Sequence, residues 1–162
     1  PITLDDAWEF FSQPKNLAKI TPPDLGLKIE DNNTIEVYAG CCISYKVKIA
    51  PMIYHNWLTE ITHVRAPYFF VDEQRMGPYK IWHHEHHFKA IKGGVEMTDI
   101  LWYQVPFGPL GKLVNSTFIK KKVKDIFEYL ELWGENSSKF LCHNYDETIK
   151  KIKGVCFSRS YS

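Results

Sequence analysis

A succession of short apolar segments, each closed by turn-forming residues, is the feature that most restricts how this chain can fold. Between residues 27 and 105, aromatic and β-branched residues recur in runs that alternate with polar ones, which is the pattern of half-buried strands. The links are rich in Gly, Pro and Asn and are too short for the helical crossovers of a parallel sheet. The pattern therefore predicts an antiparallel sheet. Its strands are expected over residues 27–29, 34–38, 43–50, 57–64, 68–74, 79–90 and 95–105.

Helical patterns flank the strand-rich region. Thr3, followed by Asp6 three positions later, is typical of a helix N-cap, so the first 11 residues predict a short helix. A second short helix is expected over 15–20, before two consecutive prolines. The longest helix is expected over 112–133, where an apolar stripe opposes a lysine-rich side. Because that stripe must be buried and the sheet is the only large partner, we expect one α+β domain with a long helix on a curved antiparallel sheet.

Composition narrows the classes of partner. The 162 residues carry a formal net charge of +1, so no overall field favours nucleic acid, and the lysines near residue 121 are explained as a solvated helix face. No apolar run reaches the roughly 18 residues that span a bilayer, so no stable membrane insertion is expected. The four cysteines are scattered without CxxC spacing, which favours free thiols in a reducing compartment. A cytoplasmic location and a monomer or homodimer are therefore predicted.

The stretch most informative about chemistry is Trp-His-His-Glu-His-His-Phe at residues 82–88. Side chains alternate between the two faces of a strand, so His84 and His86 share one face with the aromatic residues at either end. The other two histidines and the glutamate share the opposite face. Because the aromatic ends belong in the interior, His84 and His86 are predicted to point inward.

The neighbouring strand adds further polar groups to the same face. Gly93-Gly94 is a good two-residue hairpin turn, and it sets the register of the two strands. A slip of one residue would turn the polar groups of the second strand outward. With this turn, Phe88 faces Asp99, His86 faces Leu101, His84 faces Tyr103 and Trp82 faces Val105.

Three interpretations of the resulting patch of His84, His86, Asp99 and Tyr103 stay open. The four side chains can form a satisfied hydrogen-bond network in a plain core. They can orient the polar end of a mostly apolar ligand in a cavity. They can also form a metal or acid–base site, since His-x-His near a carboxylate can bind zinc and Tyr with His can move protons. Because spacing provides no third strong metal ligand, neither a metal ion nor another cofactor is expected.

A second polar set lies on the strand predicted over 68–74, where Phe70, Asp72 and Gln74 share a face. This pattern fits the wet side of an edge strand at least as well as the wall of a cavity. Trp57 and Ile61 share a face of their own strand, and ordinary core packing is the favoured explanation for them.

Several short motifs within residues 1–133 form a pattern that is specific only in combination. The motifs are Trp8-x-Phe10-Phe11, Pro14-x-Asn16-Leu17, Ile20-Thr21-Pro22-Pro23, Ile43-x-Tyr45, Trp57-x-Thr59-x-Ile61, Phe70-x-Asp72-x-Gln74, Trp82-x-His84-x-His86-x-Phe88 and Thr98-Asp99. With them the chain resembles the SRPBCC superfamily, the START-like proteins that include polyketide cyclases and birch-pollen allergens. The resemblance implies a helix-grip fold, in which a curved antiparallel sheet of about seven strands surrounds a long C-terminal helix, with two short helices near the N-terminus.

The resemblance also implies a division of the chain. Members of the superfamily begin with a strand before the first helix, and the sequence starts at Pro1, where that strand should already have ended. Residues 154–162 have a strand-like composition and resemble the usual opening, so they are predicted to supply the first strand, in the same chain or in a neighbour. The alternative is a tail without this role. The division is then a helix-grip domain over 1–133, a linker with a short helix over 134–153 and a strand-like tail over 154–162.

The favoured function is binding of a hydrophobic or amphipathic small molecule, similar to a lipid, steroid or polyketide, between the sheet and the long helix. One alternative is an enzyme of the polyketide cyclase or dehydratase type, with the four polar residues as acid–base groups. Another is a regulatory module that docks a partner protein. Whether any reaction is catalysed stays open. The predicted ligand-binding residues are Trp57, Phe70, Trp82, His84, His86, Phe88, Asp99, Leu101, Tyr103, Phe118 and Phe127.

Overall fold

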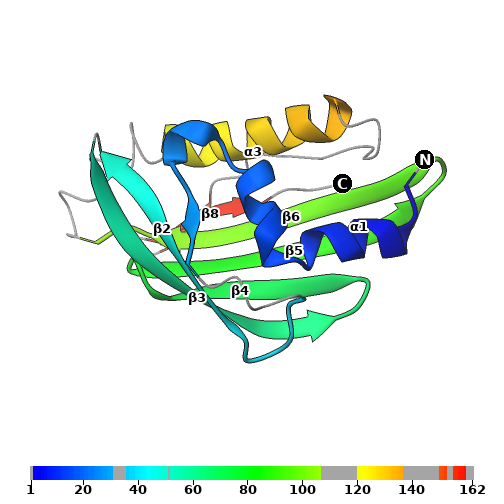
Figure 1. Cartoon of the computed structure of the whole chain (residues 1–162), viewed down its shortest axis with the longest axis horizontal. Coiled ribbons are helices and arrows are strands. Elements are labelled where there is room, and N and C mark those ends of the chain that lie inside the picture. Colours follow the sequence, from blue (N-terminus) through cyan, green and yellow to red (C-terminus); the bar gives the residue numbers. More distant parts are fainter. Residues whose placement is uncertain are drawn as a thin grey trace.

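The computed structural model describes residues 2–30, 36–50, 52–106, 120–136, 150–152 and 155–159. Their strands form one eight-stranded antiparallel sheet in the order β1-β2-β3-β4-β5-β6-β8-β7 (Figure 1). The strands are β1 (Lys28–Ile29), β2 (Cys42–Ala50), β3 (Ile53–Arg65), β4 (Phe69–Met76), β5 (Ile81–Ile91), β6 (Gly94–Gln104), β7 (Lys150–Ile152) and β8 (Val155–Arg159).

The sheet is curved, and one of its faces carries most of the core. On β6 every second residue is buried, from Val95 to Tyr103, because side chains alternate across the sheet. The pairing of β3 with β4 shifts register between Leu58 and Thr59 and again between Ile61 and His63. Such irregularities bend a strand and increase its twist. The bent sheet wraps partly around the helices that cover this face (Figure 1).

The N-terminal segment begins with α1 (Leu4–Phe11), followed by the 3-10 helices η1 (Pro14–Lys19) and η2 (Pro23–Leu25). The predicted N-cap of α1 is confirmed. The Thr3 side chain accepts a hydrogen bond from the backbone N–H of Asp6, and the Asp6 side chain accepts one from the backbone of Thr3, which completes a capping box. Trp8 on α1 is buried, and its ring meets that of Phe70 edge-on with centroids 5.9 Å apart.

The second long element on this face is α3 (Lys120–Asn136). Its buried residues recur at helical spacing, with Val123, Phe127 and Leu130 turned toward the sheet. On the outer side, Lys121 pairs with Asp125 four residues later, so this part of the lysine run lies on a solvated helix face. Neither α3 nor any other helix in the described ranges has the length and apolarity needed to cross a membrane.

The predicted helix-grip fold, with about seven strands around a long C-terminal helix and two short N-terminal helices, is wrong. The sheet has eight strands, because residues 150–152 and 155–159 form β7 and β8 beyond β6. Only α1 is α-helical near the N-terminus, since the next segment is a six-residue 3-10 helix that begins at Pro14. The C-terminal helix begins at Lys120 in the structure, and residues 112–119 of the predicted helix lie outside the described ranges.

The C-terminal strands β7 and β8 lie in two parts of the predicted division of the chain, the linker over 134–153 and the tail over 154–162. β8 pairs with β6 of the same chain, with Trp102 opposite Phe157. Residues 150–152, which belong to the predicted linker over 134–153, form β7 and pair with β8. A strand of three residues, such as β7, is too short to produce a periodic signal in the sequence.

Candidate functional site

Three neighbouring strands bring four titratable side chains onto the helix-covered face of the sheet. Asp72 of β4 is directly opposite His84 of β5, and His86 of β5 is directly opposite Asp99 of β6. Residues two apart on a strand point to the same face, and directly opposed residues share a face as well. The four side chains therefore converge, and we call them the Asp–His cluster.

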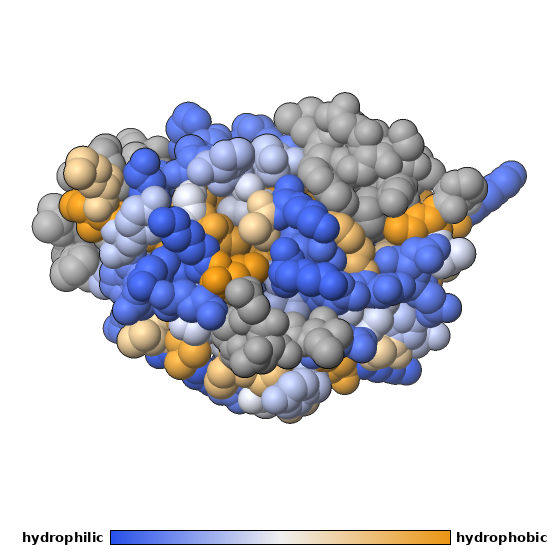
Figure 2. Space-filling model, viewed as in Figure 1, coloured by the Kyte–Doolittle hydropathy of each residue, from blue (hydrophilic) through white to orange (hydrophobic). Residues whose placement is uncertain are grey.

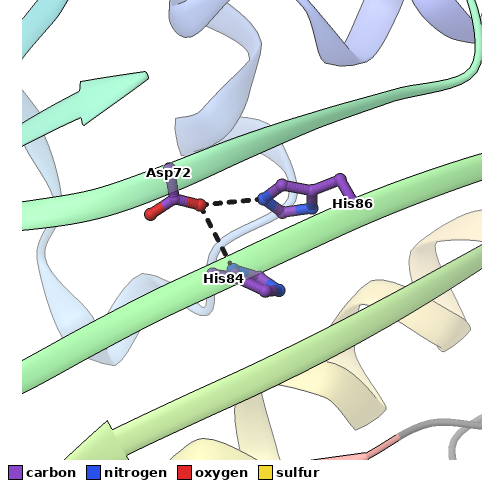
Figure 3. A group of neighbouring side chains, drawn as sticks. All are labelled: Asp72, His84 and His86. Atoms are coloured by element: carbon purple, nitrogen blue, oxygen red, sulfur yellow. Dashed lines mark hydrogen bonds and ion pairs between the residues drawn. The ribbon is translucent and has the colours of Figure 1, made fainter. Parts of the chain in front are cut away.

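Each imidazole of the cluster lies between the two carboxylates. Oδ2 of Asp72 is 3.4 Å from Nδ1 of His84 and 3.0 Å from Nε2 of His86 (Figure 3). On the other side, Oδ1 of Asp99 is 3.1 Å from Nε2 of His84 and 2.7 Å from Nδ1 of His86. The two imidazole centroids are 3.9 Å apart. All four ring nitrogens therefore have a carboxylate oxygen nearby.

Aromatic neighbours restrict the orientation of the cluster. The Phe70 ring stacks on the His86 ring with centroids 4.4 Å apart. Nε1 of Trp82 donates a hydrogen bond of 3.2 Å to Oδ1 of Asp72, the second oxygen of this carboxylate. Side chains that are packed and hydrogen-bonded in this way are pre-organised, because few rotamers are available to them.

Burial strengthens the electrostatic coupling within the cluster. The exposed side-chain fractions are 13% for Asp72, 12% for His84, 16% for His86 and 0% for Asp99. Burial alone would raise the pKa of Asp72, but the hydrogen bonds and charges of the two histidines outweigh it and hold the pKa well below its usual range. Burial alone would lower the pKa of His84, but the two carboxylates outweigh it and raise the pKa to about 10.

The cluster is a polar patch in the wall of an otherwise mostly apolar cavity. The cavity has a volume of about 520 Å³ and is lined by residues of the sheet, of the segment from α1 to η2 and of α3. Asp72, His84 and His86 line it, whereas Asp99 is not among the lining residues and lies behind the two imidazoles. On the face seen in Figure 2, hydrophobic residues are visible between hydrophilic ones near the centre. Typical apolar lining residues are Leu17, Ile20, Val47, Ile61, Ile126 and Leu130.

A second group of polar atoms lines the cavity on β2 and β3. The hydroxyl groups of Tyr45 and Thr59 are hydrogen-bonded at 2.8 Å, and both side chains are buried. Burial raises the pKa of Tyr45 well above its usual range, so this hydroxyl stays protonated. Nε1 of Trp57 is buried and has no hydrogen-bond acceptor within the part of the chain that the structure describes. The sequence pattern had favoured ordinary core packing for Trp57, but its side chain lines the cavity.

The predicted ligand-binding residues separate into two groups. The structure places several of them at the cavity, and their ring or polar atoms contribute to its wall. The residues in this group are Trp57, Phe70, Trp82, His84, His86 and Phe127.

The other predicted residues do not line the cavity. Phe88 is buried against Trp8 and Phe11 of α1, which separates it from the cavity. Leu101 and Tyr103 are buried in a second part of the core that is shared with α3. Asp99 supports the imidazoles from behind, and Phe118 lies outside the described residues.

The predicted register between β5 and β6 is wrong by two residues. Lys92 and Gly93 form the turn in place of Gly93-Gly94, and Gly93 adopts a φ of 99°, which glycine tolerates without strain. Because each residue meets a partner two positions away from the expected one, the predicted inward faces of both strands are preserved. In the observed register Phe88 faces Met97, His86 faces Asp99, His84 faces Leu101 and Trp82 faces Tyr103.

Asp72 is the member of the site that sequence reasoning did not select. It shares a strand face with Phe70, which was expected to bind ligand, and this spacing of two was the available signal. The pattern could not show that β4 is a central strand, between β3 and β5, and not an edge strand. Asp72, His84 and His86 each offer one ligand atom, and these three atoms lie within 4.8 Å of one another. Together they could hold a metal ion.

The opposite face of β5 carries the other pair of histidines. Nδ1 of His83 is 2.8 Å from Glu73, and Nε2 of His87 is 2.7 Å from Glu85. These side chains are more exposed than the cluster, at 29% for His83 and 39% for His87. They match the inner pair in residue type but do not face the cavity.

Comparison with known proteins supports the fold and says nothing about function. No protein family matches the sequence, and no curated protein matches it significantly. A solution NMR structure from Staphylococcus epidermidis is similar, with 14% identity and a TM-score of 0.57 over 89% of this chain and 90% of that one. The crystal structure of protein Ms6760 from Mycobacterium smegmatis gives 14% identity and a TM-score of 0.56 over 81% and 83%. At this identity the likeness shows the fold alone, and membership of the SRPBCC superfamily stays a prediction.

Proposed function

We propose that the protein binds a hydrophobic or amphipathic small molecule in the cavity, with the polar group of the ligand at the Asp–His cluster. The observation that carries this proposal is the cavity of about 520 Å³, whose mostly apolar wall contains one concentrated patch of charged side chains. Ligand sites in proteins are typically clefts of about 300–1,000 Å³ with mainly apolar linings and a few convergent polar groups.

The expected affinity follows from the apolar surface that a ligand would bury. Burying roughly 300 Å² of ligand surface contributes about 7 kcal/mol, at about 25 cal/mol per Å². Part of this free energy is offset by the immobilisation of the ligand. We therefore expect dissociation constants in the micromolar range for ligands similar to lipids, steroids or polyketides.

The polar atoms of the wall indicate which ligand groups would fit. Trp57 offers an N–H donor, and a buried donor without an acceptor costs on the order of 1–3 kcal/mol, which a ligand oxygen would recover. His84 and His86 line the other polar patch of the cavity together with Asp72. We therefore expect a ligand with at least one hydroxyl or carbonyl oxygen on an apolar skeleton.

Displacement of an amphipathic fluorescent dye, 1-anilinonaphthalene-8-sulfonate, by a panel of fatty acids, sterols and aromatic polyketides would test the proposal. The matched pair of variants is Ile126→Trp, which fills the cavity from α3, and Ile53→Trp, at a position that is 55% exposed. We expect Ile126→Trp to weaken dye and ligand binding at least about tenfold and Ile53→Trp to leave both unchanged. Equal binding by both variants, with the fold intact by circular dichroism, would place the dye outside the cavity and overturn the proposal.

A second candidate function is proton transfer to or from the bound molecule. It is favoured by one observation, namely that His84 and His86 line the cavity while a buried carboxylate contacts each of them. Tyr103 is buried outside the cavity wall and does not support this function directly. The His84→Ala, His86→Ala double variant tests it: mass spectrometry of a metabolite extract incubated with each protein should show turnover by the wild type alone. Equal conversion by both proteins, or by neither, would exclude proton transfer by these histidines in that extract.

A further inference from the structure

We propose that Asp72, His84 and His86 bind a divalent first-row transition metal ion such as Zn²⁺, and that Asp99 orients both imidazoles from behind. Two histidines and one carboxylate form the protein ligand set of many catalytic zinc sites and of non-haem iron sites. This inference goes beyond the binding of an organic ligand and does not depend on it, because metal binding is measured with the metal alone.

The separations of the ligand atoms fit such an ion. Around a tetrahedral zinc ion with bonds of about 2.0 Å, neighbouring ligand atoms lie about 3.3 Å apart. Oδ2 of Asp72 lies 3.4 Å from Nδ1 of His84 and 3.0 Å from Nε2 of His86. The three atoms all lie within 4.8 Å of one another, so small side-chain rotations would bring them to bonding distance from one ion.

Asp99 supplies the support that metal-binding histidines require. A histidine that binds a metal through one ring nitrogen usually donates its other N–H to a carboxylate or a carbonyl oxygen. With Nδ1 of His84 and Nε2 of His86 on the metal, the remaining nitrogens are those that face Oδ1 of Asp99, at 3.1 and 2.7 Å. One fully buried carboxylate can therefore fix the tautomer and the orientation of both rings. The hydrogen bond from Trp82 to Asp72 holds the third ligand in the same way.

The charges of the cluster also fit a divalent cation. Metal-binding imidazoles are neutral, so in the metal-bound form the negative charges of the cluster are those of the Asp72 and Asp99 carboxylates. Buried charges are costly unless a partner compensates them. A divalent ion between Asp72 and the imidazoles would neutralise both carboxylates and would displace the proton that these carboxylates hold on His84 in the metal-free protein.

The cavity is placed so that the ion would keep an open coordination position. The three proposed ligands line the cavity, whereas Asp99 lies on their far side. Catalytic zinc sites have this form, with three protein ligands and one position for water or substrate. In this protein the open position would be reached by an oxygen atom of a molecule in the cavity.

Calorimetric titration of the chelator-treated full chain with Zn²⁺, followed by the visible spectrum of the Co²⁺-loaded protein, tests the inference. We expect one equivalent of zinc, and Asp72→Asn or His86→Gln should weaken binding at least about 100-fold. Asp99→Asn, which removes only the supporting carboxylate charge, should weaken it by about 10- to 100-fold. The matched control is the His83→Gln, His87→Gln double variant on the outer face of β5, which should bind zinc as the wild type does.

X-ray absorption of the zinc-loaded wild type provides a measurement that needs no variant, in case a substitution in the cluster prevents folding. Two imidazole nitrogens and at least one oxygen around the ion would support the inference. Binding of less than half an equivalent by the wild type, or a loss of affinity in the outer double variant equal to that of His86→Gln, would overturn it. Neither result would affect the dye displacement, so the two proposals can fail separately.

Discussion

Oδ1 of Asp99 lies 2.7 Å from Nδ1 of His86, and no part of the Asp99 side chain is exposed. The same oxygen also contacts His84, so this one carboxylate compensates two buried rings. Removing one partner of a buried charged network typically costs about 3–5 kcal/mol, because the remaining groups keep their desolvation cost. We therefore expect Asp99→Asn to lower the free energy of unfolding by roughly this amount in urea denaturation with a chelator present.

The control for this prediction is Glu96→Gln, on the opposite face of the same strand. Glu96 contacts Lys89 at 3.9 Å, and the lysine side chain is 74% exposed. The Glu96 side chain is 14% exposed, but its contact with a solvated lysine is long, and pairs with a solvated partner contribute about 0–1 kcal/mol. If Asp99→Asn shifted the urea transition no more than Glu96→Gln does, Asp99 would have no part in holding the histidines.

Tyr79 makes the stability of the fold sensitive to alkaline pH. Burial raises its pKa from 10.0 to about 12, so the folded chain holds the phenolic proton more tightly than the unfolded chain does. The resulting stabilisation is complete below about pH 10 and is lost as the pH rises from about 10 to about 12. A shift of this size corresponds to at most roughly 3 kcal/mol.

We expect Tyr79→Phe to flatten the fall in the free energy of unfolding between about pH 10 and 12, measured by urea denaturation. The matched control is Tyr38→Phe, at a position that is 62% exposed. A Tyr79→Phe profile that coincides with that of the wild type would show that this hydroxyl is not buried in solution.

Two adjacent cysteines should differ sharply in reactivity. Cys41 is 2% exposed, and burial raises the pKa of its thiol, whereas Cys42 is exposed. Because the thiolate is the reactive form, alkylation under native conditions should modify Cys42 and spare Cys41. Mass spectrometry of the peptide that contains both should show one label, which Cys42→Ser removes and Cys41→Ser retains. Two labels in the native wild-type protein would contradict the burial of Cys41.

The capping box of α1 predicts a small and specific loss of stability. Thr3→Ala removes the oxygen that accepts from the Asp6 backbone N–H, and the loss of an N-cap typically costs about 1 kcal/mol. Thr3→Ser keeps the oxygen and should remain within a few tenths of the wild type. Thermal denaturation by circular dichroism compares them, and equal melting of the alanine and serine variants would mean that the cap does not form in solution.

The local features of this protein were predictable because they depend on residues close together in the sequence. The N-cap at Thr3 is a pattern of four residues, and the inward direction of His84 and His86 follows from the two-residue period of a strand. The assumed turn displaced the partners of these histidines, but by an even number of residues. For this reason Asp99 still joined the predicted patch.

Long-range relationships were not predictable in the same way. Asp72 meets His84 because β4 pairs with β5 across a connection that includes Gly77 and Pro78, and no short turn specifies that register. The number of strands was wrong because β7 is only three residues long and joins the sheet through β8, far in sequence from the other strands. A cavity is a property of how such elements close around a space, so its lining could be predicted only in part.

The ladder between β5 and β6 is continuous over all residues from Ile81 to Ile91. Deleting one residue at the end of β5, next to the turn, would therefore rotate every earlier residue of the strand to the other face of the sheet. Removal of Lys89, for example, would send His83 and His87 toward the helices and put His84 and His86 in water. Inserting or deleting one residue in β5 would thus exchange its two histidine pairs. We therefore expect related sequences to preserve the length of this strand even where its residues differ.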